Sequence, residues 1–476
     1  VSRVPDDKML LLDLAVDYNK HFWHSEVNWE YYKGFYNKQW VYSVIPNMGG
    51  KTGMTGVLDF YANGHLEALS SSNRGNLVAH GLAPEGIENN EVLYELVTDA
   101  GWSDHRMDVR DWLKQYSINR YGKAPAQLMK AWDYLLKSVY GTFTDHPRFN
   151  WQFRPGTVKN GSIYMTEDYF RGLEAFLSAS EELKDSPYYL TDLCEMTAHY
   201  LGGKAEILTR QIDQEYLLGD TLQAHFLQSR FETFMLGVDR ILSQHPTLRL
   251  DRWVSFASKA ARTEAQRKQY EMNARRIVTV WGPPVDDYSA RMWSGLIGQY
   301  YLGRWKEYYR GREKGEAVDL ASWERNWVEN NRDTYKWNSG LDIVAFAREM
   351  FALSQDVSSS SLLLDRPGMV GTWSLKPDES RELVFNIPAR MLKGLKGISI
   401  ECLKDSGRIE CTGYVLEGDG QVVASSSDRV SSGQGKLHYT LEMPEKVNAN
   451  NGCLLKLTLK SSGGNAAGII LGVNDL

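Results

Sequence analysis

The stretch LVAHGLAPEGIENNEVLYEL, residues 77–96, decides the fold. Its first seven residues, 77–83, form a short apolar run that predicts a buried strand, and a Pro-Glu-Gly turn centred on Glu85 closes it. After Asn90, apolar residues recur at helical spacing as far as Gly101, so we expect Asn90 to cap a helix that ends there. A strand, a turn and a helix in this order are typical of a parallel α/β sheet.

The preceding residues repeat the strand–helix order. Residues 8–17 predict one buried strand, and residues 40–46 predict a second that ends in the turn Asn47-Met48-Gly49-Gly50. Helical segments are expected between the strands, near residues 26–37 and 53–62. In a β/α barrel the turns at the carboxyl ends of the strands build the active site. We therefore expect residues 1–105 to be the end of such a barrel, with its site at these turns.

Residues 106–357 have helical periodicity almost throughout and predict a large α-helical domain. The expected helices are 109–121, 125–140, 166–180, 188–202, 204–242, 250–280, 287–311, 318–337 and 340–354. Within them, the basic and aromatic segment 304–312 is interpreted as a solvated helix face. The turn after Trp281 stops one helix, and Asp286 or Asp287 is expected to cap the next.

Four consecutive serines, 358–361, indicate a linker, after which the period of the sequence switches to two. The expected strands are 381–387, 397–403, 408–416, 420–427, 436–443, 453–460 and 467–473. Short alternating strands separated by turns predict a β-sandwich over residues 365–476. Cys402 and Cys411 either form a bridge across a hairpin or remain free buried thiols, and the state of Cys453 stays open. The chain is thus expected to combine α/β, all-α and all-β parts.

Composition excludes several classes of protein. Lys and Arg number 54 against 60 Asp and Glu, a net charge of −6, so a generally basic nucleic-acid binder is not expected. No apolar run approaches the ~18 residues of a membrane-spanning helix. Phosphate-binding and dinucleotide motifs are absent, and neither a cofactor nor a metal ion is predicted. The 15 Trp and 26 Tyr offer flat faces that suit sugar rings and large cores alike.

Glu85 is the sharpest candidate for chemistry, because a carboxylate on a rigid turn at the end of a strand can act as a nucleophile toward an anomeric carbon. A turn glutamate that only accepts hydrogen bonds is the alternative. Asn47 and its glycine turn are candidates to contact a sugar, although a plain βα turn has the same pattern. Trp281 and Tyr288 are expected to lie close together as a stacking wall or as a packed corner, and His146 lies in a loop where it can contact substrate.

Several motifs, in the same order, resemble the α-N-acetylglucosaminidase family, glycoside hydrolase family 89. The most specific is GLAPEGIENNEVLYEL at 81–96. The others are LLLDL at 10–14, the turn 47–50 with Gly53 and Gly56, and the segments 101–102, 120–122, 131–132 with 138–140, 154–155, 270–273, 281–283, and 300–301 with 304–305. The resemblance covers about residues 8–355.

This resemblance implies a retaining exo-glycosidase that releases terminal α-linked N-acetylglucosamine, with a barrel joined to a helical domain. It assigns the nucleophile to Glu85. It assigns the sugar contacts to Leu14, Asn47, Met48, His146, Trp281 and Tyr288. The family's general acid/base glutamate lies upstream of every segment matched here, so 1–105 is expected to be the carboxyl-terminal half of the barrel. The upstream part of the same polypeptide is then a required partner, and we expect this chain alone to be inactive.

Two further interpretations remain open. The chain is either this glycosidase or a non-catalytic glycan-binding protein that uses the β-sandwich, and a third possibility makes the sandwich a structural cap. Its single tryptophan, Trp373, gives weak support to a stacking platform, so an accessory or structural role is favoured. Family and chemistry imply a location outside the cytoplasm. The N-acetylglucosamine is carried either by a mucin-type glycan or by a heparan-like chain end, and the sequence does not choose between them.

Overall fold

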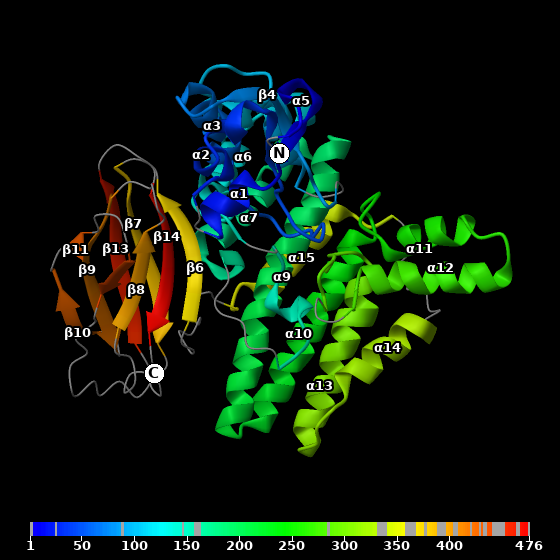
Figure 1. The fold of residues 1–476 in the computed structure, drawn as a ribbon. Coiled ribbons are helices and arrows are strands. Elements are labelled where there is room, and N and C mark those ends of the chain that lie inside the picture. The colour runs from blue at the N-terminus through cyan, green and yellow to red at the C-terminus, as the bar shows by residue number, and fades with distance from the viewer. Residues whose placement is uncertain are drawn as a thin grey trace.

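The computed structural model describes the greater part of the chain (Figure 1). The described residues are 3–23, 26–86, 90–144, 147–156, 163–282, 286–330, 340–357, 368–375, 378–387, 397–402, 408–418, 421–427, 430–431, 436–439, 453–462 and 467–474. Within them the order of elements is a parallel α/β region, a large helical region and a sheet-rich region.

The amino-terminal region contains a parallel sheet of three strands in the order β1 (Leu10–Asp13), β2 (Gln39–Val44) and β4 (Asn76–Leu82). The elements between them are α1 (Val16–His21), α2 (Asn28–Tyr31), η2 (Gly34–Asn37), β3 (Gly56–Val57) and α3 (Leu58–Ser70), and η1 (Asp6–Lys8) precedes β1. The parallel strand–helix order is as expected.

The first expected strand, 8–17, is wrong in two respects. It ends at Asp13, because α1 already begins at Val16. It is also not buried, since Leu10 and Leu12 are each 57% exposed. The strand expected at 77–83 forms as β4 but is not buried either, since Val78 is 49% exposed. An apolar run shows that a strand forms but does not show which of its faces has a partner.

The helix after Glu85 is α4 (Glu91–Ala100), which ends at Gly101 as expected. Asn90 does not cap it with its side chain. The residue has a φ of 55°, and its side-chain amide donates to Thr55 O at 2.9 Å while its oxygen accepts from Tyr140 OH at 2.9 Å. The Asn90 side chain therefore connects the start of α4 to Thr55 and to Tyr140, and it does not cap the helix.

The helical region comprises several long helices and short turns. They are α5 (Val109–Tyr121), α6 (Ala126–Leu135), η3 (Asn150–Gln152), η4 (Ile163–Met165), α7 (Glu167–Ser178), α8 (Ser180–Leu183), α9 (Pro187–Leu218), α10 (Thr221–Leu242), α11 (Leu250–Lys259), α12 (Glu264–Ile277), the π-helical η5 (Ile297–Tyr301), α13 (Leu302–Lys314), α14 (Leu320–Asn330) and α15 (Ile343–Ser354). The two-residue β5 (Gly141–Thr142) pairs with β3. Figure 1 shows α11 and α12 projecting as a hairpin away from the central helices.

The helix break expected after residue 202 is wrong. The helix α9 runs through Gly202 and Gly203, and the chain breaks at Gly219, after which Asp220 caps α10 by accepting from Gln223 N at 2.9 Å. A Cβ on Gly203 would lie 2.3 Å from Tyr164 O. The two glycines are therefore required because other segments of the protein approach the helix closely at this point, and not because the helix ends there.

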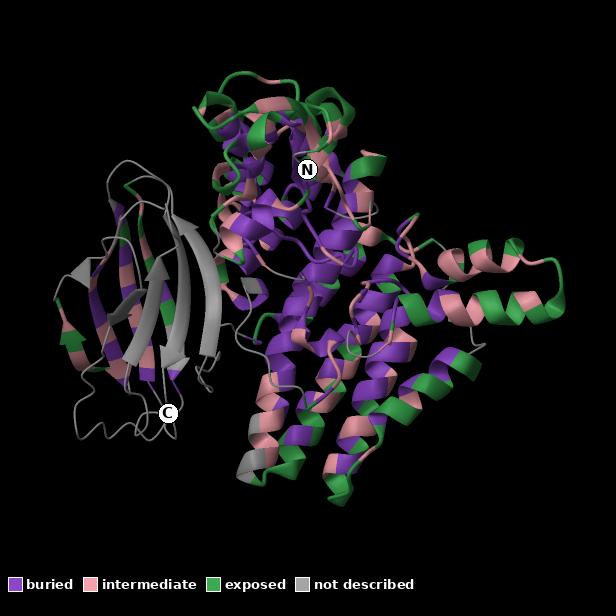
Figure 2. Cartoon of the chain, in the orientation of Figure 1, coloured by how far each residue is buried: buried purple, intermediate pink, exposed green. Residues whose placement is uncertain are grey.

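Buried residues occupy the middle of the helical region (Figure 2), and many of them are aromatic. Trp132, Trp151, Tyr164, Tyr200 and Tyr300 are all at most 1% exposed. Most of the tryptophan and tyrosine content that suggested sugar contacts therefore belongs to the core.

The carboxyl-terminal region consists of two antiparallel sheets, one with β7 (Ser380–Ile387), β9 (Arg408–Gly418), β10 (Gln421–Ser426), β11 (Val430–Ser431) and β13 (Cys453–Ser462), the other with β6 (Gly368–Leu375), β8 (Gly397–Cys402), β12 (Lys436–Tyr439) and β14 (Ala467–Asn474). All seven expected strands are present, and β6 and β11 were missed.

Cys402 and Cys411 lie in different sheets, so they do not face each other across a hairpin. Cys411 and Cys453 are free buried thiols.

In the described part of the chain, no helix combines the length and the apolar character that crossing a membrane requires.

Candidate functional site

Glu85 lies on the turn after β4, beside the end of β2. The two strands stay paired up to this point, where Ala83 N donates to Val44 O at 2.9 Å. The exposed Glu85 carboxylate accepts two hydrogen bonds on Oε2, one from Gly49 N and one from Tyr288 OH, the latter at 2.6 Å. The turn after β2, the turn after β4 and a loop of the helical region therefore meet at one carboxylate oxygen.

Gly49 and Gly50 are both required by this arrangement. Their φ angles are 74° and 61°, the left-handed region that favours glycine. A Cβ on Gly49 would lie 2.2 Å from Tyr288 O, and one on Gly50 would lie 2.7 Å from Glu85 O. The paired glycines let the β2 turn fit between the nucleophile candidate and the helical region.

Further side chains of the loop that carries Tyr288 form hydrogen bonds with the turn after β2. Ser289 Oγ donates to Gly49 O at 2.8 Å, and the Arg291 guanidinium donates to the same oxygen. The buried Lys51 ammonium lies 4.5 Å from the centre of the Tyr288 ring. Sequence reasoning missed Ser289, Arg291 and Lys51, because each contact joins segments far apart in the chain.

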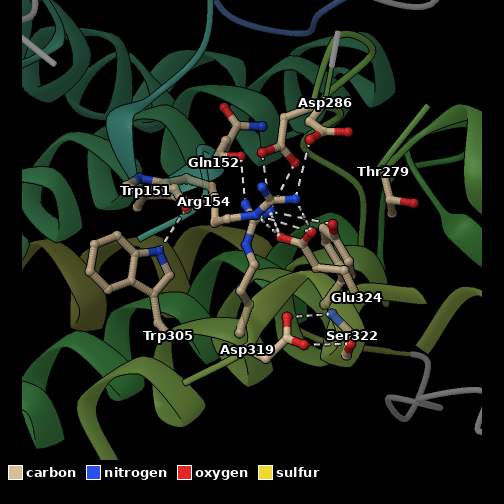
Figure 3. A network of polar contacts seen from close by, with 12 residues as sticks. Trp151, Gln152, Arg154, Thr279, Asp286, Trp305, Asp319, Ser322 and Glu324 are labelled. Carbon is tan, nitrogen blue, oxygen red and sulfur yellow. Dashed lines mark hydrogen bonds and ion pairs between the residues drawn. The ribbon is translucent and has the colours of Figure 1, made fainter. Parts of the chain in front are cut away.

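A buried network of polar contacts holds the residue that precedes Tyr288, and Figure 3 shows this network. Arg304 is fully buried, and its Nη1 lies 3.0 Å from Asp287 Oδ1 and 2.8 Å from Glu324 Oε1. Its Nη2 donates to Gln152 O at 2.8 Å. Burial raises the pKa of the Asp287 carboxyl, and the Arg304 guanidinium opposes that shift.

Three expectations about this segment are therefore wrong. Asp287 does not cap a helix, because it has a φ of 58° and directs its carboxylate to Arg304. The expected helix 287–311 begins later, at η5 and α13. Arg304 also does not lie on a solvated face. A basic and aromatic run has the same pattern whether its partners are water or buried carboxylates.

A cavity of about 640 Å³ opens beside Glu85, within the usual size range of small-molecule pockets. Among the described residues that line it, Glu85 is the single carboxylate. The others are Gly49, Gly50, Thr52, Gly86, Thr247, Arg252, Trp253, Phe256, Ile277, Val278, Trp281, Tyr288, Ser289, Arg291 and Trp293. The rings of Trp281 and Tyr288 lie 5.3 Å apart at 60°, and Trp281 is 42% exposed. The two aromatic candidates are therefore adjacent, as expected, and face the cavity with Glu85.

The other candidates that the structure describes, Asn47, Leu14 and Met48, do not line this cavity. Asn47 is buried, and its amide donates to Tyr94 OH at 2.7 Å, which in turn donates to Gly86 O at 2.6 Å, so Asn47 supports the Glu85 turn. Leu14 is 43% exposed beyond the end of β1, and Met48 packs against a small cluster that includes Tyr18. His146 lies outside the described residues.

A second, smaller cavity of about 30 Å³ lies between α4 and α9 and has room for about one water molecule. Glu91, Glu195 and Asp192 line it. Asp192 pairs with Arg120 at 2.6 Å, whereas Glu195 contacts His245 at 3.2 Å. Removal from water is the main influence that raises the pKa of Glu91 to about 8 and that of Glu195 to about 8.

We expect the chain to lose stability as the pH rises from about 5 to about 8. The ordinary pKa of a glutamate is 4.5. Between these pH values the folded state therefore binds more protons than the unfolded state, so the free energy of unfolding falls as the pH rises. Glu195→Gln should reduce this pH-dependent loss in the free energy of unfolding by about 1 kcal/mol or more. The measurement is the thermal or urea midpoint at a series of pH values. The exposed Glu182→Gln serves as control. An unchanged slope in Glu195→Gln would contradict the assignment.

Comparison with known proteins identifies the family. Residues 112–352 match the profile of the α-N-acetylglucosaminidase C-terminal domain, and residues 1–104 match that of the α-N-acetylglucosaminidase TIM-barrel domain. The chain therefore belongs to the α-N-acetylglucosaminidase family, as its motifs indicated. Human α-N-acetylglucosaminidase is 29% identical over 323 residues, which cover 64% of this chain and 41% of the human protein.

Solved structures agree with this fold. The family 89 glycoside hydrolase of Clostridium perfringens, bound to 2-acetamido-1,2-dideoxynojirmycin, has a TM-score of 0.66 at 24% identity, over 74% of this chain and 42% of that chain. A form of that enzyme with two glutamates changed to glutamine, bound to its substrate GlcNAc-α-1,4-galactose, has a TM-score of 0.64 at the same identity and coverage. The chain thus spans less than half the length of these relatives.

Proposed function

We propose that the polypeptide containing this chain is a retaining exo-glycosidase that releases terminal, non-reducing α-linked N-acetylglucosamine from glycans. The observation that carries the proposal is the position of Glu85. It is the single carboxylate in the described lining of the cavity, it follows a parallel barrel strand, and two donors orient it. Family membership supports the same activity.

Glu85 would act as the nucleophile of a double displacement. Gly49 N and Tyr288 OH both donate to Oε2, while in the described part of the chain Oε1 accepts no hydrogen bond. Oε1 is therefore the oxygen that forms a bond to the anomeric carbon as the bond to the leaving oxygen breaks. Water then attacks the same carbon, which releases the Glu85 carboxylate and gives a sugar of retained configuration.

A second carboxyl group is needed to protonate the leaving oxygen and later to activate the water. Retaining glycosidases place it about 5–5.5 Å from the nucleophile. We propose that the upstream part of the polypeptide supplies it. Three parallel strands are described here, whereas a whole barrel has about eight. The form of the bacterial relative bound to its substrate carries two glutamate-to-glutamine changes, which fits a pair of catalytic glutamates.

The sugar contacts proposed are Trp281 and Tyr288 from the helical region and Leu14, Asn47 and Met48 from around the barrel turns. His146 is proposed from the family resemblance alone. Trp281 and Tyr288 have the best support, because both line the cavity. The buried Asn47 would act by holding the Glu85 turn through Tyr94.

The two carboxyl-terminal sheets are proposed to pack as a β-sandwich with an accessory or structural role. Arg381 of β7 donates to Lys137 O of the helical region at 2.8 Å, which supports a fixed attachment. A location outside the cytoplasm is proposed from the glycan-degrading activity of the family.

The test is hydrolysis of an aryl N-acetyl-α-glucosaminide by the polypeptide that joins this chain to its upstream part, called below the full-length polypeptide. We expect release of N-acetylglucosamine from the α-linked and not from the β-linked glycoside. Proton NMR should show the α-anomer first, because two displacements retain configuration. First appearance of the β-anomer would contradict the nucleophile, and no release from the α-glycoside would contradict the function.

A further inference from the structure

The cavity beside Glu85 continues along the helical hairpin of α11 and α12, beyond the residues assigned to N-acetylglucosamine. Trp253 and Phe256 of α11 and Ile277 of α12 line this distal part. Figure 1 shows that the hairpin projects from the central helices, and these three side chains place it in the lining of the cavity. The candidate site therefore extends past the sugar that is cleaved.

The two aromatic residues on this wall differ in what they contact. Trp253 connects α11 to its neighbours, since its indole N–H donates to Ala274 O at 2.9 Å and its ring lies 5.9 Å from that of Trp293. Phe256, one turn further along α11, is 51% exposed, and Ile277 opposite is 41% exposed. The hairpin is thus fixed by one aromatic ring and presents a second ring to the cavity.

Cationic groups accompany the exposed ring. The Arg252 guanidinium lines the cavity 5.1 Å from the centre of the Phe256 ring, and the Lys259 ammonium lies 6.0 Å from the same centre. An aromatic face stacks on the C–H face of a pyranose, and guanidinium N–H groups donate to the hydroxyl oxygens at its edge. The wall therefore has the chemistry of a sugar subsite.

We propose that Phe256, with Arg252, forms the subsite for the hexose to which the terminal N-acetylglucosamine is linked. The inference rests on the proposed function, because it takes Glu85 as the point of cleavage. Phe256 then sets the preference for a disaccharide end over an N-acetylglucosaminide with a small aglycone, and it touches the sugar that leaves.

The experiment measures binding to the full-length polypeptide carrying Glu85→Gln, so that the ligands are not hydrolysed. Calorimetry compares GlcNAc-α-1,4-galactose with methyl N-acetyl-α-glucosaminide. We expect the disaccharide to bind about tenfold more tightly, and Phe256→Ala to remove that difference while leaving the methyl glycoside unaffected. Phe256→Trp should retain the difference, because it keeps the stacking face.

Phe226→Ala is the matched control. Phe226 is 56% exposed on α10 and has Arg230 one turn away, with its guanidinium 5.9 Å from the ring, but it does not line the cavity. Loss of the preference in Phe226→Ala, or its persistence in Phe256→Ala, would overturn the subsite and leave the proposed function standing. Failure of the Glu85→Gln polypeptide to bind either glycoside would overturn both.

Discussion

Glu85→Gln is expected to lower turnover of an aryl N-acetyl-α-glucosaminide by the full-length polypeptide about 10⁴-fold or more. The amide is nearly the same size as the carboxylate and still accepts from Gly49 N and Tyr288 OH, so the turn should keep its shape. It lacks the charge needed to form a glycosyl ester. Steady-state kinetics should therefore show a collapse of kcat, while calorimetry shows retained binding of the sugar.

A chemical rescue separates a nucleophile from a carboxylate that only stabilises charge. In Glu85→Ala, azide should enter the space left by the side chain and partly restore cleavage, giving a glycosyl azide in place of the free sugar. Glu95→Gln, an exposed glutamate on α4 outside the cavity, should keep its turnover. Turnover of Glu85→Gln within tenfold of the parent would contradict the assignment of the nucleophile.

Local signals in the sequence were enough to predict the turn that carries Glu85. The apolar run 77–83, the proline and glycine around Glu85, and the helix that ends at Gly101 all depend on neighbours within a few residues. Asn90 shows where such reasoning fails. Its type and place fit a helix cap, but Thr55 and Tyr140 are better partners for its side chain in the fold.

The other half of the candidate site was not predictable from local patterns. Glu85 receives its second hydrogen bond from Tyr288, 203 residues later in the chain. Ser289 and Arg291 bind Gly49 over a comparable separation. The nearness of Trp281 and Tyr288 was predicted, because a single short turn joins them, but the approach of that turn to the barrel depends on the packing of the whole helical region.

Arg304→Met is expected to produce the largest loss of stability among changes outside the cavity. The substitution leaves the buried carboxylate of Asp287 without its guanidinium partner and Gln152 O without its donor, while Glu324 keeps its ion pair with Arg154. Removing one partner of a buried ion pair costs about 3–5 kcal/mol. Calorimetry should show the transition of the helical region lowered by roughly 10 °C.

Arg310→Met, on the same helix α13, is the matched control. Arg310 pairs with Glu307 at 2.7 Å, but both side chains are substantially exposed, so its loss should leave the transition temperature nearly unchanged. Arg304→Lys should lie between the two, because an ammonium keeps the charge and loses the planar fork. Since Asp287 directly precedes Tyr288, Arg304→Met should also weaken sugar binding at temperatures where it is still folded. Equal stability of Arg304→Met and Arg310→Met would show that the buried network does not hold the Tyr288 loop against Glu85.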